Sequence, residues 1–266
     1  TGEDPLLATR TSATGRGARF NADQCIACHS QPAIGGSGGF LAPNPKDSVR
    51  RVPENPLFDL VPHRFGQANK VPAFIQQYGP IRVPRFVKKA DGTPDGQIYP
   101  LYTIVGRTDD PSIPGCNARV LPQPDFDGEL KKGNIAFRIP LQLFGMGLIE
   151  AIPESTILAH ADPADTNGDG ISGRPNWVIA PDYVPEYEIG GGAGPQLGRF
   201  SRKANISALL AQIVGAYHQD VGITTDYVPN EVNHPDGNGY ALGDAVADPE
   251  LSASTVHSVL FYLRLL

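Results

Sequence analysis

Cysteine and methionine are scarce in this sequence, whose 266 residues include only three cysteines and one methionine. Three cysteines are too few for the disulfide framework that stabilises small secreted domains. No apolar run approaches the ~18 residues of a membrane-spanning helix, and no basic block offers a surface for nucleic acid. A phosphate-binding Walker loop, a dinucleotide fingerprint and a Ser/His/Asp arrangement are also missing. We therefore expect no membrane span and no nucleic-acid partner.

Glycine and proline are abundant instead, with 30 and 26 residues respectively. They follow no fibrous or low-complexity period, so they indicate many ordered turns between short helices. The net charge of −6 is mild and spread along the chain. Amphipathic periodicity is clear only in the C-terminal part of the sequence.

The motif that carries chemistry is Cys25-Ile26-Ala27-Cys28-His29. On a helix the two thiols lie one turn apart and the histidine follows on the same face. Two thioethers to one haem and an iron–imidazole bond are thus within reach. A redox dithiol would need a βαβ pattern, which is absent, and a zinc site would need two further ligands from Cys116 and scattered histidines. We predict one covalent haem c, bound through Cys25, Cys28 and His29.

The surroundings of this motif allow further predictions. The carbonyl of Pro32 is close enough in sequence to hold the His29 ring through its Nδ1–H group. Arg138 and Arg199 lie beside aromatic residues and are candidates to pair with haem propionates, although most arginines are surface residues. Cys116 is then left as a buried, inert thiol or as one half of a disulfide to another segment.

The ligand on the other face of the iron decides the chemistry. A thioether closes the iron and favours electron transfer, whereas an open face permits peroxide chemistry. Met146 lies between two glycines that would let the backbone approach a flat ring, so we predict it as the distal ligand. The alternative is a core methionine that fills a gap. His218 and His63 are the next candidates, and the remaining histidines are His160, His234 and His257.

A second possible metal site follows the pattern of a calcium loop. Asp165, Asn167 and Asp169 occupy positions 1, 3 and 5 of a segment with glycine at position 6, as in the first half of an EF-hand loop. The twelfth position is Asn176 rather than a bidentate glutamate, which excludes a sensor EF-hand. We predict a structural Ca²⁺ held by these three side chains and the Ile171 carbonyl. The alternative is a turn rich in Asp and Asn that holds no ion.

These features together predict a mainly α fold, a cytochrome c-like helical haem domain with long proline- and glycine-rich loop insertions and little β structure. We interpret residues 1–266 as a single domain. Its expected parts are an N-terminal haem helix at about 21–31, a loop-rich insertion at about 35–205, and C-terminal helices at about 206–218 and 253–266.

Several segments together resemble the di-haem oxidoreductase (thiol oxidoreductase-like) family, whose members are related to bacterial di-haem cytochrome c peroxidases. The most specific are the block from Arg-Ile-Pro to Glu-Ala-Ile-Pro and the loop Asp-x-Asn-x-Asp-Gly-Ile-Ser-Gly. The resemblance spans nearly the whole chain. Its segments are 20–32, 138–153, 165–176, 197–200, 220–224 and 261–266.

The resemblance implies an electron-relay haem in one domain and a reactive haem in a second. This sequence contains one Cys-x-x-Cys-His site. We therefore expect the chain to be the relay half, which works with a second haem domain or subunit or another redox partner protein. A self-contained peroxidase-like enzyme with an open distal site remains the alternative, as does a calcium-stabilised docking subunit, so the sequence leaves open whether the chain is itself an enzyme. Covalent haem ligation and the family both imply a periplasmic or otherwise extracytoplasmic location.

Overall fold

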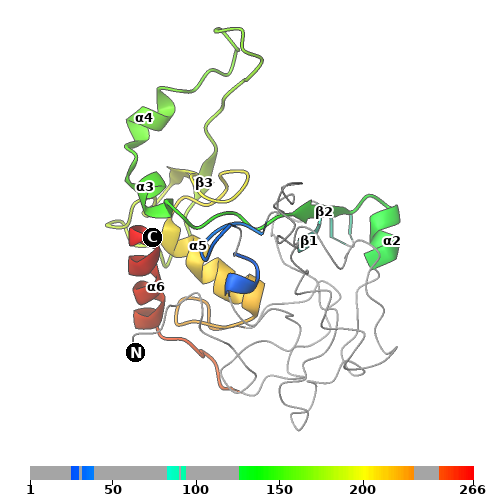
Figure 1. Cartoon of the computed structure of the whole chain (residues 1–266), viewed down its shortest axis with the longest axis vertical. Helices are drawn as coiled ribbons and strands as arrows, with labels where there is room; N and C mark the ends of the chain where they lie inside the picture. The colour runs from blue at the N-terminus through cyan, green and yellow to red at the C-terminus, as the bar shows by residue number, and fades with distance from the viewer. Residues whose placement is uncertain (1–24, 30–31, 39–82, 90, 94–125, 231–245) are drawn as a thin grey trace, which may run out of the picture. The chain divides into compact units, whose positions relative to one another are not determined.

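Figure 1 shows the computed structural model of the chain, in which the structure describes residues 25–29, 32–38, 83–89, 91–93, 126–230 and 246–266. Contacts between Cα atoms divide the chain into two compact units. The first comprises Thr1–Gln142 and Ala216–Ser252, and the second comprises Leu143–Gly215 and Ala253–Leu266. The single domain expected from the sequence stays a prediction, because one domain can contain two compact units.

The first unit contains a two-stranded antiparallel sheet of β1 (Val83–Phe86) and β2 (Ile135–Arg138). Helix α2 (Phe126–Lys131) precedes β2, and Gly133, with φ of 69°, reverses the chain between them. A left-handed glycine is the usual end of a helix because it carries no Cβ that would clash. The Cys25–His29 motif of this unit begins with the 3₁₀ turn η2 (Cys25–Ala27).

A π-helical turn, η4 (Tyr217–Val221), also belongs to the first unit. It ends at Gly222, whose φ of 69° is left-handed and whose N–H donates to the Tyr217 carbonyl. Such wide turns are rare inside helices and are frequent at functional sites. The chain that follows is fully buried at Ile223 and Thr224.

The second unit consists mainly of short helices joined by turns. Helix α3 begins after the left-handed Gly145, and Pro153 separates it from α4. Helix α6 buries Val256, Val259, Leu260 and Leu263, which is the spacing of one helical face. The elements of this unit are α3 (Met146–Ala151), α4 (Glu154–Leu158), β3 (Trp177–Ile179), β4 (Pro195–Leu197), α5 (Leu209–Ala216) and α6 (Ala253–Leu265). Strands β3 and β4 pair antiparallel, and α5 runs directly into η4.

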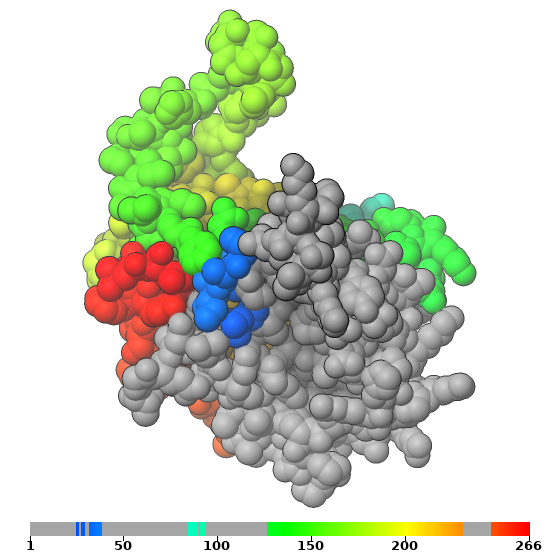
Figure 2. Space-filling model, viewed as in Figure 1, coloured from blue at the N-terminus to red at the C-terminus, as the bar shows by residue number. Residues whose placement is uncertain are grey.

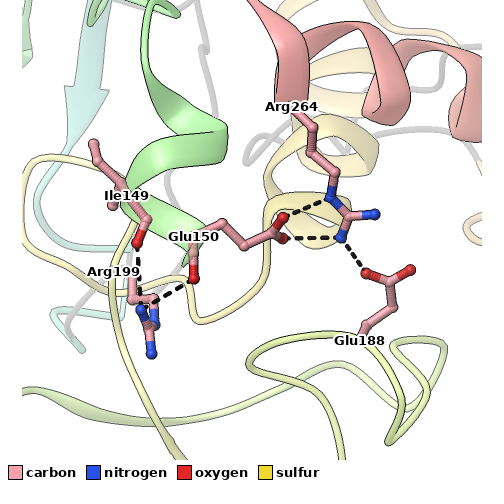
Figure 3. A network of polar contacts seen from close by, with 5 residues as sticks. All are labelled: Ile149, Glu150, Glu188, Arg199 and Arg264. Carbon is pink, nitrogen blue, oxygen red and sulfur yellow. Dashed lines mark hydrogen bonds and ion pairs between the residues drawn. The ribbon is translucent and has the colours of Figure 1, made fainter. Parts of the chain in front are cut away.

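Two buried carboxylates share one arginine in the second unit, as Figure 3 shows. Nε of Arg264 donates to Glu150 Oε2 at 2.5 Å, and Nη2 donates to Glu150 Oε1 at 3.1 Å and to Glu188 Oε2 at 2.5 Å. Nη1 of Arg199 donates to the carbonyls at the end of α3, among them Ile152 at 2.5 Å. The network thus ties α3 to α6 and satisfies carbonyls that a helix end leaves without partners.

The prediction of a mainly α, cytochrome c-like helical domain is wrong. Helices account for 31% and strands for 15% of the described residues. Gly133 and Pro153 follow closely on the ends of α2 and α3, which are six residues each, and the segment expected to be loop contains two small sheets instead. The haem helix expected at 21–31 is only the turn Cys25–Ala27 within its described residues. Among the helices that the structure describes, none is long and apolar enough to cross a membrane.

Candidate haem attachment site

One short turn carries the two thiols and the imidazole of the motif. The N–H groups of Cys28 and His29 both donate to the Cys25 carbonyl, at 3.1 and 3.0 Å. These bonds close the turn, so Cys25, Cys28 and His29 are presented by a single loop of backbone. That is the arrangement that attachment to one porphyrin requires.

The His29 ring is oriented by a residue far away in the sequence. Its Nδ1 lies 2.7 Å from the Leu141 carbonyl, which can only accept, so Nδ1 carries the proton and Nε2 keeps its lone pair. Burial lowers the pKa of His29, while the bond to Leu141, the charge of Asp220 and a backbone hydrogen bond with Gly36 act in the opposite direction. A neutral imidazole whose Nε2 keeps its lone pair is the form that binds iron. Leu141 therefore takes the position predicted for Pro32.

The second thiol, Cys28, is half-buried. Burial raises the pKa of Cys28 to about 12, and the charges of Asp220 and Cys25 add to this effect. The thiol is therefore protonated at neutral pH, unlike the activated thiolate of a redox dithiol. Among the described residues, no group of three or more His, Cys, Asp and Glu could hold a metal ion. The protonated thiol beside the oriented imidazole fits a thioether-linked haem better than a redox dithiol.

The loop after the motif packs closely on the segment that follows β2. The N–H of Gly38 donates to the Pro140 carbonyl at 3.1 Å. A Cβ on Gly38 would lie 2.6 Å from the Pro140 ring and 2.9 Å from the Cys28 carbonyl, so only glycine fits here without a shift. Together with the bond from His29 to Leu141, this contact fixes the site against the segment that follows β2.

An ion pair that sequence reasoning missed lies at the same site. The charge of Asp220, in η4, adds to burial in raising the pKa of Cys28 and opposes the lowering of the His29 pKa by burial. Arg85 of β1 places Nη2 3.3 Å from Asp220 Oδ1, and its side chain is only 11% exposed. The two residues are 135 positions apart, so no local pattern could have joined them.

The predicted arginine partners of haem have different settings. Arg138 ends β2 opposite Val83, and the register places it on the same sheet face as Arg85, because side chains alternate along a strand. Arg199 belongs to the second unit, where its Nη1 is engaged with the carbonyls of α3. Cys116 lies outside the described residues.

The candidate distal ligands are dispersed. Met146 is buried, 6% exposed, at the start of α3 in the second unit. His218 lies in η4 of the first unit with Nε2 2.7 Å from the Asn230 carbonyl, and burial lowers its pKa. His160 is exposed and His257 is half-buried in α6, while His63 and His234 lie outside the described residues. The assignment of Met146 stays a prediction.

The predicted calcium loop is an exposed turn held together by its own side chains. Asp165 Oδ1 accepts from the N–H of Gly170 at 3.1 Å, and Asp169 Oδ1 accepts from the N–H of Ile171 at 2.8 Å. Asn167 Oδ1 accepts from the N–H of Asp169 at 3.0 Å. Figures 1 and 2 show the chain after α4 extending away from α3 and α6. The calcium ligands, including the Ile171 carbonyl, stay a prediction.

The comparison with known families gives one match. Residues 126–254 match the model of the family described as "Di-haem oxidoreductase, putative peroxidase". The match includes Leu141, Met146 and Asp220 but begins after the Cys25–His29 turn. No curated protein and no solved structure matches the chain. The resemblance deduced from the sequence motifs is thus confirmed over residues 126–254, the segment that is similar to the di-haem oxidoreductase family.

Proposed function

We propose that this chain binds one haem covalently through Cys25, Cys28 and His29 and passes electrons through it as the relay half of a peroxidase-like di-haem oxidoreductase. The observation that carries the proposal is the bond from His29 Nδ1 to Leu141, which leaves Nε2 for iron beside two thiols on the same turn. The family match supports a haem-based redox role.

The residues of the site perform three tasks in this proposal. When bound, haem supplies a one-electron Fe(III)/Fe(II) couple. The two cysteines hold it through thioethers, each formed by adding one S–H across one vinyl group. Leu141 holds the His29 ring in one tautomer, with Nε2 keeping the lone pair that would bind iron. Such an environment favours fast electron transfer because little has to rearrange when the charge changes.

The remaining parts of the proposal concern the second iron ligand and the partner. Met146 as the distal ligand would close the iron, which is the property of a relay rather than of a peroxidase. The electron would then pass to a second haem domain or subunit. Covalent attachment of haem favours a periplasmic or other extracytoplasmic location for this partnership.

The deciding experiment is the intact mass together with electronic spectra of the holoprotein with and without dithionite. We expect one covalent haem and a low-spin spectrum that cyanide does not change. Cys25→Ala with Cys28→Ala should abolish covalent haem, whereas the matched control Cys116→Ala should retain it. Met146→Ala should convert the iron to a high-spin form that binds cyanide.

Other outcomes would overturn parts of this proposal. A wild-type iron that is high-spin and binds cyanide or peroxide refutes the relay role and supports a self-contained peroxidase. An unchanged spectrum and potential in Met146→Ala refutes Met146 as the ligand. A wild-type protein without covalent haem refutes the whole proposal.

We also propose that the loop from Asp165 to Ile171 binds a structural Ca²⁺. The spacing of Asp165, Asn167 and Asp169 supports this proposal, since alternate oxygen side chains and a glycine turn are typical of calcium loops. A chelator should then lower both the melting temperature and the calcium content of the purified protein. Asp169→Asn should do the same, whereas Asp182→Asn, outside the loop, should not. Unchanged calcium content and melting temperature after chelation would refute the ion.

A further inference from the structure

We propose that the hairpin made by β3 and β4 is a docking surface for a protein segment that combines apolar residues with lysine or arginine. The hairpin belongs to the second unit. It contains none of the residues proposed to bind haem, so the inference goes beyond the proposed function. We call the exposed side chains that carry it the hairpin surface: Trp177, Ile179, Asp182, Glu186, Tyr187 and Ile189.

The two strands close the base of the hairpin. Trp177 is paired with Leu197 and Ile179 with Pro195, so the residues between Ile179 and Pro195 form the connecting loop. Successive side chains of a strand alternate between its two faces, which places Trp177 and Ile179 on the same face of β3. Trp177 is 47% exposed and Ile179 is 69% exposed. Strand β3 thus offers two large apolar side chains to the surroundings.

The connecting loop is anchored in the interior of the second unit. Val184 is buried in a cluster that includes Ala211 of α5. Ser207 Oγ donates to the Gly190 carbonyl at 2.7 Å, and a Cβ on Gly190 would clash with the Ser207 carbonyl. The exposed side chains are therefore held on a fixed backbone. A surface that is already ordered loses less conformational entropy when it binds a partner.

The loop adds further apolar side chains to the hairpin surface. Tyr187 is 82% exposed, and Ile189 is 44% exposed. The residue between them, Glu188, is buried and paired with Arg264. Single exposed apolar residues are normal, whereas a group of them marks an interaction site. Because tryptophan and tyrosine are the residue types that most often contribute strongly to protein interfaces, we infer a protein partner.

The charge of the hairpin indicates the chemistry of that partner. No lysine, arginine or histidine lies between Arg174 and Arg199, and both arginines donate to backbone carbonyls. Asp182 and Glu186 are exposed in the loop. Residues 153–198 as a whole contain seven acidic residues and one arginine. Lysine or arginine around an apolar centre would complement both the charge and the exposed side chains.

The same charge disfavours other occupants. A second copy of this chain would bring one acidic loop against another, and like charges at an interface repel. Nucleic acid and anionic membranes are negatively charged as well. A Ca²⁺ ion at the loop from Asp165 to Ile171 would offset part of the negative charge of residues 153–198 and leave the segment acidic.

The test is a calorimetric titration of the purified holoprotein with synthetic peptides. The probe alternates leucine with lysine. One control peptide has glutamate in place of every lysine, and another has serine in place of every leucine. We expect the leucine–lysine peptide to bind more tightly than either control and to bind more weakly as the salt concentration rises. Trp177 is the single tryptophan of the chain, so the bound peptide should protect its fluorescence from quenching by acrylamide.

Matched variants locate the binding on the hairpin. Ile179 and Ile171 are 69% and 68% exposed, but only Ile179 belongs to the hairpin surface. Ile179→Ser and Tyr187→Ser should each weaken binding about fivefold or more, whereas Ile171→Ser should not change it. Glu186→Gln should weaken binding and reduce its salt dependence, and Asp91→Asn, in the first unit, should affect neither. Thermal unfolding checks that each variant is folded.

Several outcomes would overturn the inference. A leucine–lysine peptide that does not bind, or binds no better than the control peptides, refutes the proposed chemistry of the partner. An equal loss in Ile179→Ser and Ile171→Ser, or a Trp177 that stays open to the quencher, refutes the location. A dimer in analytical ultracentrifugation that Tyr187→Ser dissociates would assign the surface to a second copy instead. None of these results depends on haem, so failure of the relay proposal leaves this inference intact, and the reverse also holds.

Discussion

Replacing Arg264 by methionine tests how α3 and α6 are joined. Methionine keeps most of the apolar stem of the side chain but removes the guanidinium. Glu150 and Glu188, which are 4% and 9% exposed, then lose the cation that they share. The variant leaves two buried carboxylates without this guanidinium. The free-energy cost of desolvating each carboxylate on folding is then offset less.

The expected cost follows from the burial of the three groups. Removing one partner of a buried ion pair costs about 3–5 kcal/mol in the free energy of unfolding. The Arg264 side chain is 34% exposed, so water reduces its contribution and places the cost near the lower limit, at about 3 kcal/mol. For a chain of this size, that loss corresponds to a melting temperature lower by about 6–12 °C.

Thermal unfolding of the holoprotein, followed by circular dichroism, measures this loss. The matched control is Lys132→Met, which breaks the exposed pair with Glu129 and should cost less than about 1 kcal/mol. A further test introduces Glu150→Gln into both the wild-type protein and the Arg264→Met variant. Glu150→Gln should destabilise the wild-type protein but stabilise Arg264→Met, because there it removes one of the uncompensated buried charges.

Two results would refute this reasoning. The first is an Arg264→Met variant that loses no more stability than Lys132→Met. The second is a Glu150→Gln substitution that destabilises both backgrounds equally, since residues that do not interact have additive effects. Either result would mean that the packing of α3 on α6, rather than the shared charge, holds the two helices together.

Three further predictions concern other contacts. Gly147→Ala should lower the free energy of unfolding by about 1–3 kcal/mol, because the added Cβ would clash with the Arg264 backbone. Gly215→Ala, whose Cβ would lie in open space within α5, should raise the free energy of unfolding by about 0.5–1 kcal/mol. A loss of stability in both variants would contradict this reasoning. Arg199→Met should cost about 2 kcal/mol and speed hydrogen exchange in α3, since three carbonyls lose their donor; unchanged exchange would refute that role. Burial lowers the pKa of His218 below its ordinary 6.5, so the unfolded chain binds the proton first and stability should fall as the pH drops from about 7 to 5. His218→Gln should flatten this slope, and an identical slope would exclude His218 as its source.

The parts of this protein that depend on neighbours in sequence were predictable. The spacing of Cys25, Cys28 and His29 identifies candidate haem ligands without any structure. The apolar spacing at 253–266 identifies the helix found at Ala253–Leu265. Motifs around α3 and the loop from Asp165 identify the family, which the match at 126–254 confirms.

The parts that depend on distant contacts were not predictable. Sequence proximity favoured Pro32 as the acceptor for His29, but the acceptor is Leu141 because the chain after β2 returns to the site. Arg85 is in a strand that contains Pro84, a residue that supplies no N–H to a sheet, so neither β1 nor its ion pair with Asp220 could be read locally. The mainly α prediction failed for a related reason: periodicity detected helices, whereas strands of three or four residues leave no periodic signal.

The bond between His29 and Leu141 has a consequence for the order of folding. It closes a loop across 112 positions, and contacts of such long range form late because the chain must first lose the entropy of the intervening segment. The turn from Cys25 to His29, in contrast, needs only its own neighbours. The anchoring residues can therefore be in place while the imidazole still rotates. The orientation of the ring then reports on late folding, because it is fixed only when the segment after β2, which carries Leu141, has reached the turn.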